Sequence, residues 1–161
     1  MKELLDRYVR KLKEEEYTVV GQDASRPWGG FLLLSEGDAG RFAKEYFKDV
    51  DAEKIKIGGQ LSPKILFVQP ERRLSWQYHH RRAEIWQVIE GQVGVIRSST
   101  DTEGPIETLN QGDQIQLAQG ERHRLVGLDQ PAVLAEIWIH TDPQHPSNEE
   151  DIVRVQDDFG R

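Results

Sequence analysis

Short apolar segments separated by turn residues fill most of the chain after residue 54, and this pattern constrains the fold more than any other feature. The segments lie at 64–68, 74–79, 84–89, 92–97, 106–109, 114–117, 122–126 and 132–140, and a last one at 151–155 follows a proline-containing loop. Glycine and asparagine occupy the turns, at Glu90-Gly91, Asn110-Gln111-Gly112 and Gln119-Gly120. Strands this short and this regularly interrupted indicate an antiparallel sandwich or barrel.

The first third of the chain has a different pattern. Residues 2–16 and 39–50 each place their apolar side chains on one helical face, and Asp38 is a candidate N-cap for the second helix. A turn at residues 26–30 leads into a short strand at Phe31–Leu34. We therefore expect a helix and strand extension, residues 1–53, that packs on a β-barrel of residues 54–161 within one compact domain.

Composition excludes several classes of function. With 161 residues the chain can build one domain with its own core, and its net charge of −7 argues against nucleic-acid and anionic-membrane partners. There are no cysteines, which excludes disulfides and thiolate metal sites. The N-terminus has acidic residues and no apolar run, and no stretch approaches the roughly 20 apolar residues of a membrane span. These features predict a cytoplasmic protein.

Four polar residues from two distant segments could jointly hold a divalent metal ion. They are Gln77, His79, Glu84 and His123. Alternate residues of a strand share a face, so Gln77 and His79 point the same way, and a narrow barrel brings inward groups of facing strands together. Nitrogen and oxygen ligands suit zinc, our first choice, and also manganese, iron, cobalt or nickel. One carboxylate leaves the site a formal charge of about +1, so the bound ion remains a Lewis acid.

The spacing of these residues resembles the two motifs of the cupin family. His79, Glu84 and Gly91 fall at the spacing of the first motif, and Gly112, Gly120 and His123 at that of the second. Within cupins, residues 74–86 resemble the isomerase domain of type II mannose-6-phosphate isomerases, which is usually fused to a mannose-1-phosphate guanylyltransferase. Residues 26–29 and 150–161 are similar to the flanking motifs of that family. The resemblance implies an all-β cupin jelly-roll barrel with an N-terminal helical extension, here as a stand-alone domain.

Several positions depart from the family pattern. Gln77 replaces the first histidine of the general motif, as it does in the isomerase branch, and Arg81 stands where the isomerases usually carry a histidine. The replacements at turns are Glu71 and Gly127 for glycine and asparagine, and Ala118 for proline. The turn replacements affect backbone geometry, whereas Arg81 lies near the site and bears on the substrate.

The implied reaction interconverts mannose 6-phosphate and fructose 6-phosphate through an enediol, within GDP-mannose and polysaccharide biosynthesis. The resemblance places Glu84, Arg81 and His80 in the catalytic machinery. Two interpretations of His80 stay open, a base or an exposed neighbour, and metal-bound water is another candidate base. Lys64, Arg82 and Arg154 join Arg81 as candidates to bind the substrate phosphate, with Arg81 preferred because it shares the strand parity of His79.

Other functions fit the same residues. A different metal-dependent cupin enzyme, such as an oxygenase or an epimerase, would use the same ligands, and a non-catalytic cupin would bind sugar phosphates without turnover. Trp86 and Trp138 could be core residues or sugar-stacking platforms. The apolar helix faces also lead us to expect a homodimer.

Overall fold

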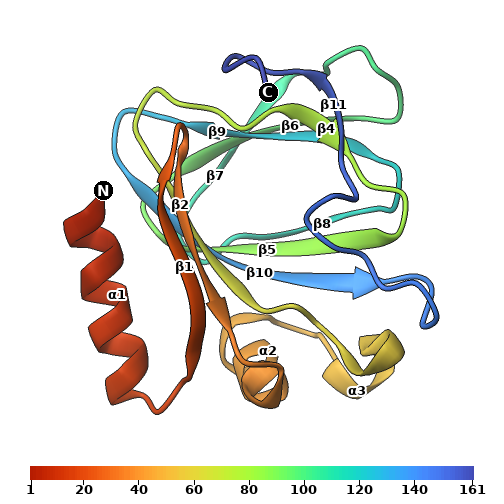
Figure 1. Cartoon of the computed structure of the whole chain (residues 1–161). Helices are drawn as coiled ribbons and strands as arrows, with labels where there is room; N and C mark the ends of the chain where they lie inside the picture. Colours follow the sequence, from red (N-terminus) through yellow and green to blue (C-terminus); the bar gives the residue numbers. More distant parts are fainter.

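Two antiparallel sheets face each other and form the barrel (Figure 1) in the computed structural model, which describes residues 1–161. The six-stranded sheet contains, in spatial order, β1 (Val19–Arg26), β2 (Gly29–Leu34), β3 (Lys64–Val68), β10 (Ala132–His140), β5 (Arg82–Glu90) and β8 (Gln114–Leu117). The five-stranded sheet contains β11 (Val153–Gln156), β4 (Trp76–Tyr78), β9 (Arg122–Gly127), β6 (Val93–Ser98) and β7 (Ile106–Leu109). The expected all-β architecture is confirmed.

Most of the predicted strands are present. Four of them, at 64–68, 106–109, 114–117 and 132–140, have the predicted bounds, whereas β4 is shorter and β5 begins two residues earlier than expected. Strand β1 was not predicted. It lies at the edge of its sheet, it is polar, and its Val20 side chain is largely exposed, so its sequence shows little of the apolar alternation of a buried strand.

Three helices lie on the outer side of the six-stranded sheet (Figure 1). Helix α1 (Lys2–Glu14) runs along β1, and α2 (Ala39–Tyr46) and α3 (Ala52–Ile55) lie beside each other. Short 3₁₀ turns at 36–38 and 57–59 complete the connection to β3. Helix α2 ends before the predicted residue 50, because the backbone N–H of Lys48 donates to the side chain of Gln114 instead of continuing the helix. Asp38 occupies the N-cap position of α2 as predicted, but its carboxylate makes no capping hydrogen bond and accepts from the backbone N–H of Thr18 instead.

Residues from the N-terminal third complete the barrel sheet. Strand β2 pairs with β3 from Gly29 opposite Val68 to Leu33 opposite Lys64. The backbones approach so closely here that a Cβ at Gly29, whose φ is +151°, would lie 1.8 Å from the Phe67 carbonyl oxygen. Gly127, one of the departures from the family motif, is similarly confined, with 2.1 Å from a Cβ to the Gln69 carbonyl oxygen. Neither position can accept a side chain without moving the backbone.

Two apolar layers form on opposite faces of the six-stranded sheet. We call the layer under the helices the outer core and the layer inside the barrel the barrel core. Strand β10 contributes to both, with Val133, Ala135 and Ile137 in the outer core and Ala132 and Leu134 in the barrel core. The next inward positions of β10 therefore point toward the interior of the barrel, where the polar residues gather.

Candidate metal centre and cavity

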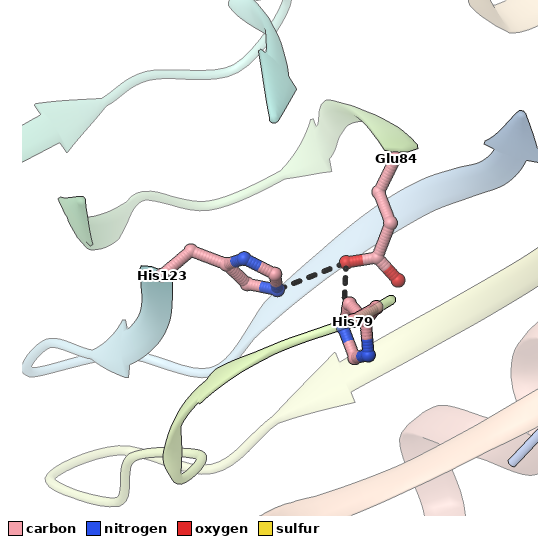
Figure 2. Close-up of side chains that lie close together, drawn as sticks. All are labelled: His79, Glu84 and His123. Carbon is pink, nitrogen blue, oxygen red and sulfur yellow. Dashed lines mark ion pairs between the residues drawn. The ribbon is translucent and has the colours of Figure 1, made fainter. Parts of the chain in front are cut away.

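Strands from both sheets bring three potential ligands together inside the barrel (Figure 2). His79 follows β4, Glu84 lies on β5 and His123 on β9, and all three side chains are buried. The Glu84 Oε1 atom is 3.0 Å from His123 Nε2 and 3.5 Å from His79 Nε2. One ligand atom from each residue lies within 4.8 Å of the others, a cluster that could hold one metal ion.

Hydrogen bonds to backbone carbonyls set the tautomer of both histidines. His79 Nδ1 is 2.7 Å from the carbonyl oxygen of Asp151, and His123 Nδ1 is 3.0 Å from that of Glu121. A carbonyl oxygen only accepts, so each Nδ1 carries a proton and each Nε2 is the ring nitrogen that faces the cluster. This is the orientation that metal-ligating histidines require.

The cluster fits a cation and is unfavourable without one. Glu84 Oε1 and His123 Nε2 are buried, lie 3.0 Å apart and have no hydrogen-bond partner outside the cluster, so only a cation, either a proton on the imidazole or a metal ion, can offset the carboxylate charge there. Buried polar atoms without partners are rare and costly in folded proteins. A divalent metal ion bound between them would satisfy all three atoms at once.

Gln77 lies beside this cluster. It pairs with His123 across β4 and β9, and its amide nitrogen is 3.5 Å from His79 Nε2. Its amide oxygen accepts a hydrogen bond from Ser75 Oγ at 2.5 Å. A rotation of the amide group by half a turn would present the oxygen to the cluster, as a fourth ligand requires.

Arg82 holds the second oxygen of Glu84. Its Nε is 3.1 Å from Glu84 Oε2, its Nη1 donates to Ser147 Oγ at 2.9 Å, and the guanidinium carbon stands 3.6 Å from the centre of the Trp138 ring. Burial opposes ionisation of Glu84, but His79 and Arg82 outweigh it and hold the pKa of that carboxyl well below its usual range. Glu84 is therefore a carboxylate with one oxygen oriented and the other directed at the histidines.

A cavity of about 130 Å³ opens beside Glu84 and Gln77. Five cationic residues and three acids line it, so cations are in excess although the chain is acidic overall: Arg26, Lys64, Arg82, Arg154 and Arg161, against Glu84, Glu136 and Glu149. Burial lowers the pKa of Arg154, and the nearby Arg161 and Arg26 lower it further. Positive charge so concentrated favours an anionic ligand such as a phosphate group.

Comparison with known proteins identifies the family. Residues 42–157 match the family described as mannose-6-phosphate isomerase C-terminal. The chain belongs to this family. It is 36% identical to the xanthan biosynthesis protein XanB of Xanthomonas campestris over 109 residues, which are 68% of this chain and 22% of that protein. It is 28% identical to the alginate biosynthesis protein AlgA of Pseudomonas aeruginosa over 149 residues, 81% of this chain and 29% of that protein.

The chain thus spans less than a third of the length of these curated relatives. Solved structures show the same fold at low sequence identity. Oxalate decarboxylase from Bacillus subtilis aligns with a TM-score of 0.58 at 14% identity, covering 83% of this chain and 29% of that chain. The capsular polysaccharide assembling protein CapF from Staphylococcus aureus aligns with a TM-score of 0.55 at 14% identity, covering 87% and 32%. The barrel is a cupin barrel, and its family makes it a sugar-related cupin.

In this mannose-6-phosphate isomerase C-terminal domain, only some of the predicted substrate and catalytic residues lie at the cavity. Lys64, Arg82 and Arg154 line the cavity, whereas Arg81 and His80 do not. The chain bends at residues 80–81, where the backbone N–H groups of both donate to the Asp151 carboxylate at 2.9 Å. The strand parity expected for Arg81 is therefore not observed, and Arg82, the first residue of β5, takes the inward position. His80 is exposed and packs edge-on against the Tyr78 ring.

The structure adds residues that the sequence analysis did not single out. Arg26 and Arg161 line the cavity and belong to the two flanking motifs. Their place in those motifs could have marked them as candidate site residues. Asp151 holds the bend at 80–81 through its carboxylate and His79 through its carbonyl oxygen, and nothing in the sequence indicates these contacts. Glu136, a buried residue of β10, was marked only by being the one acid in an apolar strand.

None of the helices is long and apolar enough to cross a membrane.

Proposed function

We propose that this domain is a metal-dependent isomerase that interconverts mannose 6-phosphate and fructose 6-phosphate through an enediol, within polysaccharide biosynthesis. The observation that carries the proposal is the juxtaposition of the buried cluster of His79, Glu84 and His123 with a cavity lined by cationic residues. A neutral sugar would need the metal cluster but not the cationic residues of the cavity. The names of the curated relatives, XanB and AlgA, agree with a role in polysaccharide biosynthesis.

The cluster and Gln77 would hold one divalent ion, zinc first and otherwise manganese, iron, cobalt or nickel. Such an ion, when bound, stabilises the negative charge that develops on a sugar oxygen as a proton leaves the neighbouring carbon. Arg82 orients Glu84 and keeps it ionised, which makes it a positioning residue rather than a phosphate ligand in this proposal.

Phosphate binding falls to the arginines of the cavity other than Arg82. Arg26 and Arg161 pair with Asp23 and Asp157 at 3.1 and 2.9 Å, whereas Arg154 makes no ion pair. Arg154 is exposed and lies near Arg26 and Arg161, and guanidinium groups bind phosphate oxygens in pairs. Lys64 is already paired with an exposed acid, Glu149, at 2.6 Å, and a phosphate group would compete with that carboxylate. The substrate is then oriented with its phosphate at the arginines and its C1–C2 end toward Glu84.

Proton NMR of the zinc-loaded protein with mannose 6-phosphate in heavy water tests the proposal. We expect deuterium at C2 together with growth of fructose 6-phosphate, and neither after the metal is removed by a chelator. Binding of the sugar phosphate with neither exchange nor fructose 6-phosphate formation, with zinc shown to be bound, would overturn the isomerase and favour the non-catalytic binding protein. Oxygen uptake by the iron-loaded protein would instead favour an oxygenase. The homodimer stays a prediction that light scattering at micromolar concentration tests.

A further inference from the structure

Glu136 is a buried carboxyl on the cavity wall that the proposed metal site does not use. Its side chain is about as inaccessible to solvent as that of Glu84 (6% and 4% exposed), whereas the third acid at the cavity, Glu149, is 61% exposed. Glu136 shares the inward face of β10 with Leu134 and Trp138, in a strand whose other residues from Ala132 to Ile139 are apolar. An apolar residue there would cost less to bury, so packing alone does not account for the carboxyl.

Two indole groups orient this carboxyl. Trp86 Nε1 donates to Glu136 Oε2 at 2.7 Å, and Trp138 Nε1 donates to Oε1 at 3.0 Å. The nearest cation, Lys64 Nζ, is 4.0 Å from Oε1 but 2.6 Å from Glu149. An indole donates a hydrogen bond but carries no charge, so the carboxyl is oriented without being committed to an ion pair. It can exist with or without its proton, as an acid–base group must.

The register of the sheet places Glu136 close to the metal cluster. On the paired strands β5 and β10, Glu84 is opposite Trp138, and Trp86 is opposite Glu136. Glu84 and Glu136 are therefore diagonal neighbours on one face, with Cα atoms about 7–8 Å apart by the usual sheet geometry. Both line the same cavity. A ligand that reaches the cluster with its C1–C2 end therefore passes beside the Glu136 carboxyl.

We propose that Glu136 is the catalytic acid–base residue that carries the proton between C2 and C1 of the hexose phosphate, an assignment that rests on the proposed isomerase function. The Glu136 carboxylate takes the proton from C2, the C2–H electron pair becomes the C1–C2 double bond, and the C1 carbonyl pair moves onto O1. The O2 proton then passes to O1, the C2 carbonyl forms, and the double-bond pair takes the proton back from Glu136 at C1. No atom or electron is gained or lost, so no co-reactant is needed.

The charges around Glu136 suit this role. Burial and the negative charge of Glu84 raise the pKa of Glu136, Lys64 and Arg82 lower it, and the result is a pKa of about 7. A metal ion bound at Glu84 would offset the charge of that carboxylate, so the role rests on the position of Glu136, held by two indoles beside Glu84 on the cavity wall. His80, the base considered from the sequence, is exposed and does not line the cavity.

The test compares zinc-loaded Glu136→Gln with the wild type, using mannose 6-phosphate in heavy water. We expect the rate of deuterium incorporation at C2 to fall by about 10²- to 10⁴-fold. Zinc content and the Kd for mannose 6-phosphate by calorimetry should stay within about threefold of the wild type, because the variant keeps the ligands and the arginines. Glu107→Gln, the same change on exposed β7, is the matched control and should exchange like the wild type.

Exchange by Glu136→Gln within about threefold of the wild type would overturn the assignment and leave the isomerase proposal standing. Absence of both exchange and fructose 6-phosphate formation in the wild type with zinc bound would overturn both. Glu136→Asp keeps the carboxyl but withdraws it, and should retain more exchange than Glu136→Gln. If the glutamine variant does not fold, Glu136→Asp decides the question. A loss of about tenfold or more at unchanged Kd and zinc content supports the assignment, and a rate close to that of the wild type contradicts it.

Discussion

The outer core and the barrel core lie on opposite faces of one sheet, yet they have opposite chemistry. The outer core is made of apolar and aromatic side chains, and its polar atoms are tyrosine hydroxyls such as that of Tyr8, which donates to Glu90 at the rim. The barrel interior combines an apolar base with the buried charged residues Arg82, Glu84 and Glu136. Strand β10 contributes alternate residues to each side. The side chains that stabilise the fold and those of the candidate site thus lie on opposite faces of the same strand.

The buried charges are tolerated because each is bound by groups from elsewhere in the chain. Ser147 and Asp151, in the segment between β10 and β11, hold Arg82 and His79. Ser147 Oγ also donates to the Asp151 carboxylate at 2.6 Å. In the outer core no such network is needed, because apolar burial alone lowers the free energy. Substitutions in the two regions should therefore differ in kind, and four predictions test this contrast.

The largest effect should follow from Glu84→Ala. Because this change removes the only carboxylate of the cluster, we expect zinc affinity to fall by more than about 100-fold and isomerase activity to be lost with it. Metal analysis after dialysis and the heavy-water assay measure the two quantities. Glu107→Ala on exposed β7 is the control, and a Glu84→Ala variant that is active without metal would contradict the proposed centre.

Phe42→Ala should lower stability without changing metal binding or activity. Phe42 is fully buried in the outer core and its ring packs against those of Tyr17, Tyr46 and Phe47, so its removal should cost about 3–5 kcal/mol of the free energy of unfolding. Urea denaturation measures this loss. Zinc content and exchange rate per folded molecule should not change, and a large fall in either would show that the two faces are not separate.

A pH-dependent difference in stability should sharpen the contrast further. The folded-state pKa of Glu136, about 7, lies above the ordinary value of 4.5, so the folded state holds this proton more tightly than the unfolded state. The associated stability is present below about pH 4.5 and is lost as the pH rises to 7, by roughly 2–4 kcal/mol. We expect the metal-free wild type to lose stability relative to Glu136→Gln over this range in urea denaturation. Parallel pH profiles for the two proteins would be inconsistent with this account.

The smallest effect should come from a rim ion pair that belongs to neither core. Asp158 pairs with Arg73 at 2.6 Å with both side chains partly exposed, and the pKa of Asp158 is lowered to about 2. Its contribution is present above the ordinary pKa of 3.8 and disappears as the pH falls to 2. Because solvent screens the pair, Asp158→Asn should change the free energy of unfolding at pH 7 by less than about 1 kcal/mol. A loss as large as that for Phe42→Ala would contradict this interpretation.

Much of the fold was predictable because its signals are local. Apolar patterns and turn residues located β3, β7, β8 and β10 with their bounds, since both signals lie in consecutive residues. The edge strand β1 and the early end of α2 were not predictable in this way. The first lacks a buried alternation, and the second depends on a hydrogen bond between Lys48 and Gln114, which are far apart in the chain.

The amino-acid sequence by itself determined the barrel and the types and spacing of His79, Glu84 and His123, because strand periodicity and short motifs are properties of neighbouring residues. Only the tertiary structure decided that Arg82 rather than Arg81 lines the cavity, since a bend held by Asp151 changes the parity of the strand. It also decided which carbonyls orient the histidines and that two indoles hold Glu136 beside Glu84. These choices depend on contacts between segments distant in sequence, which no local pattern records.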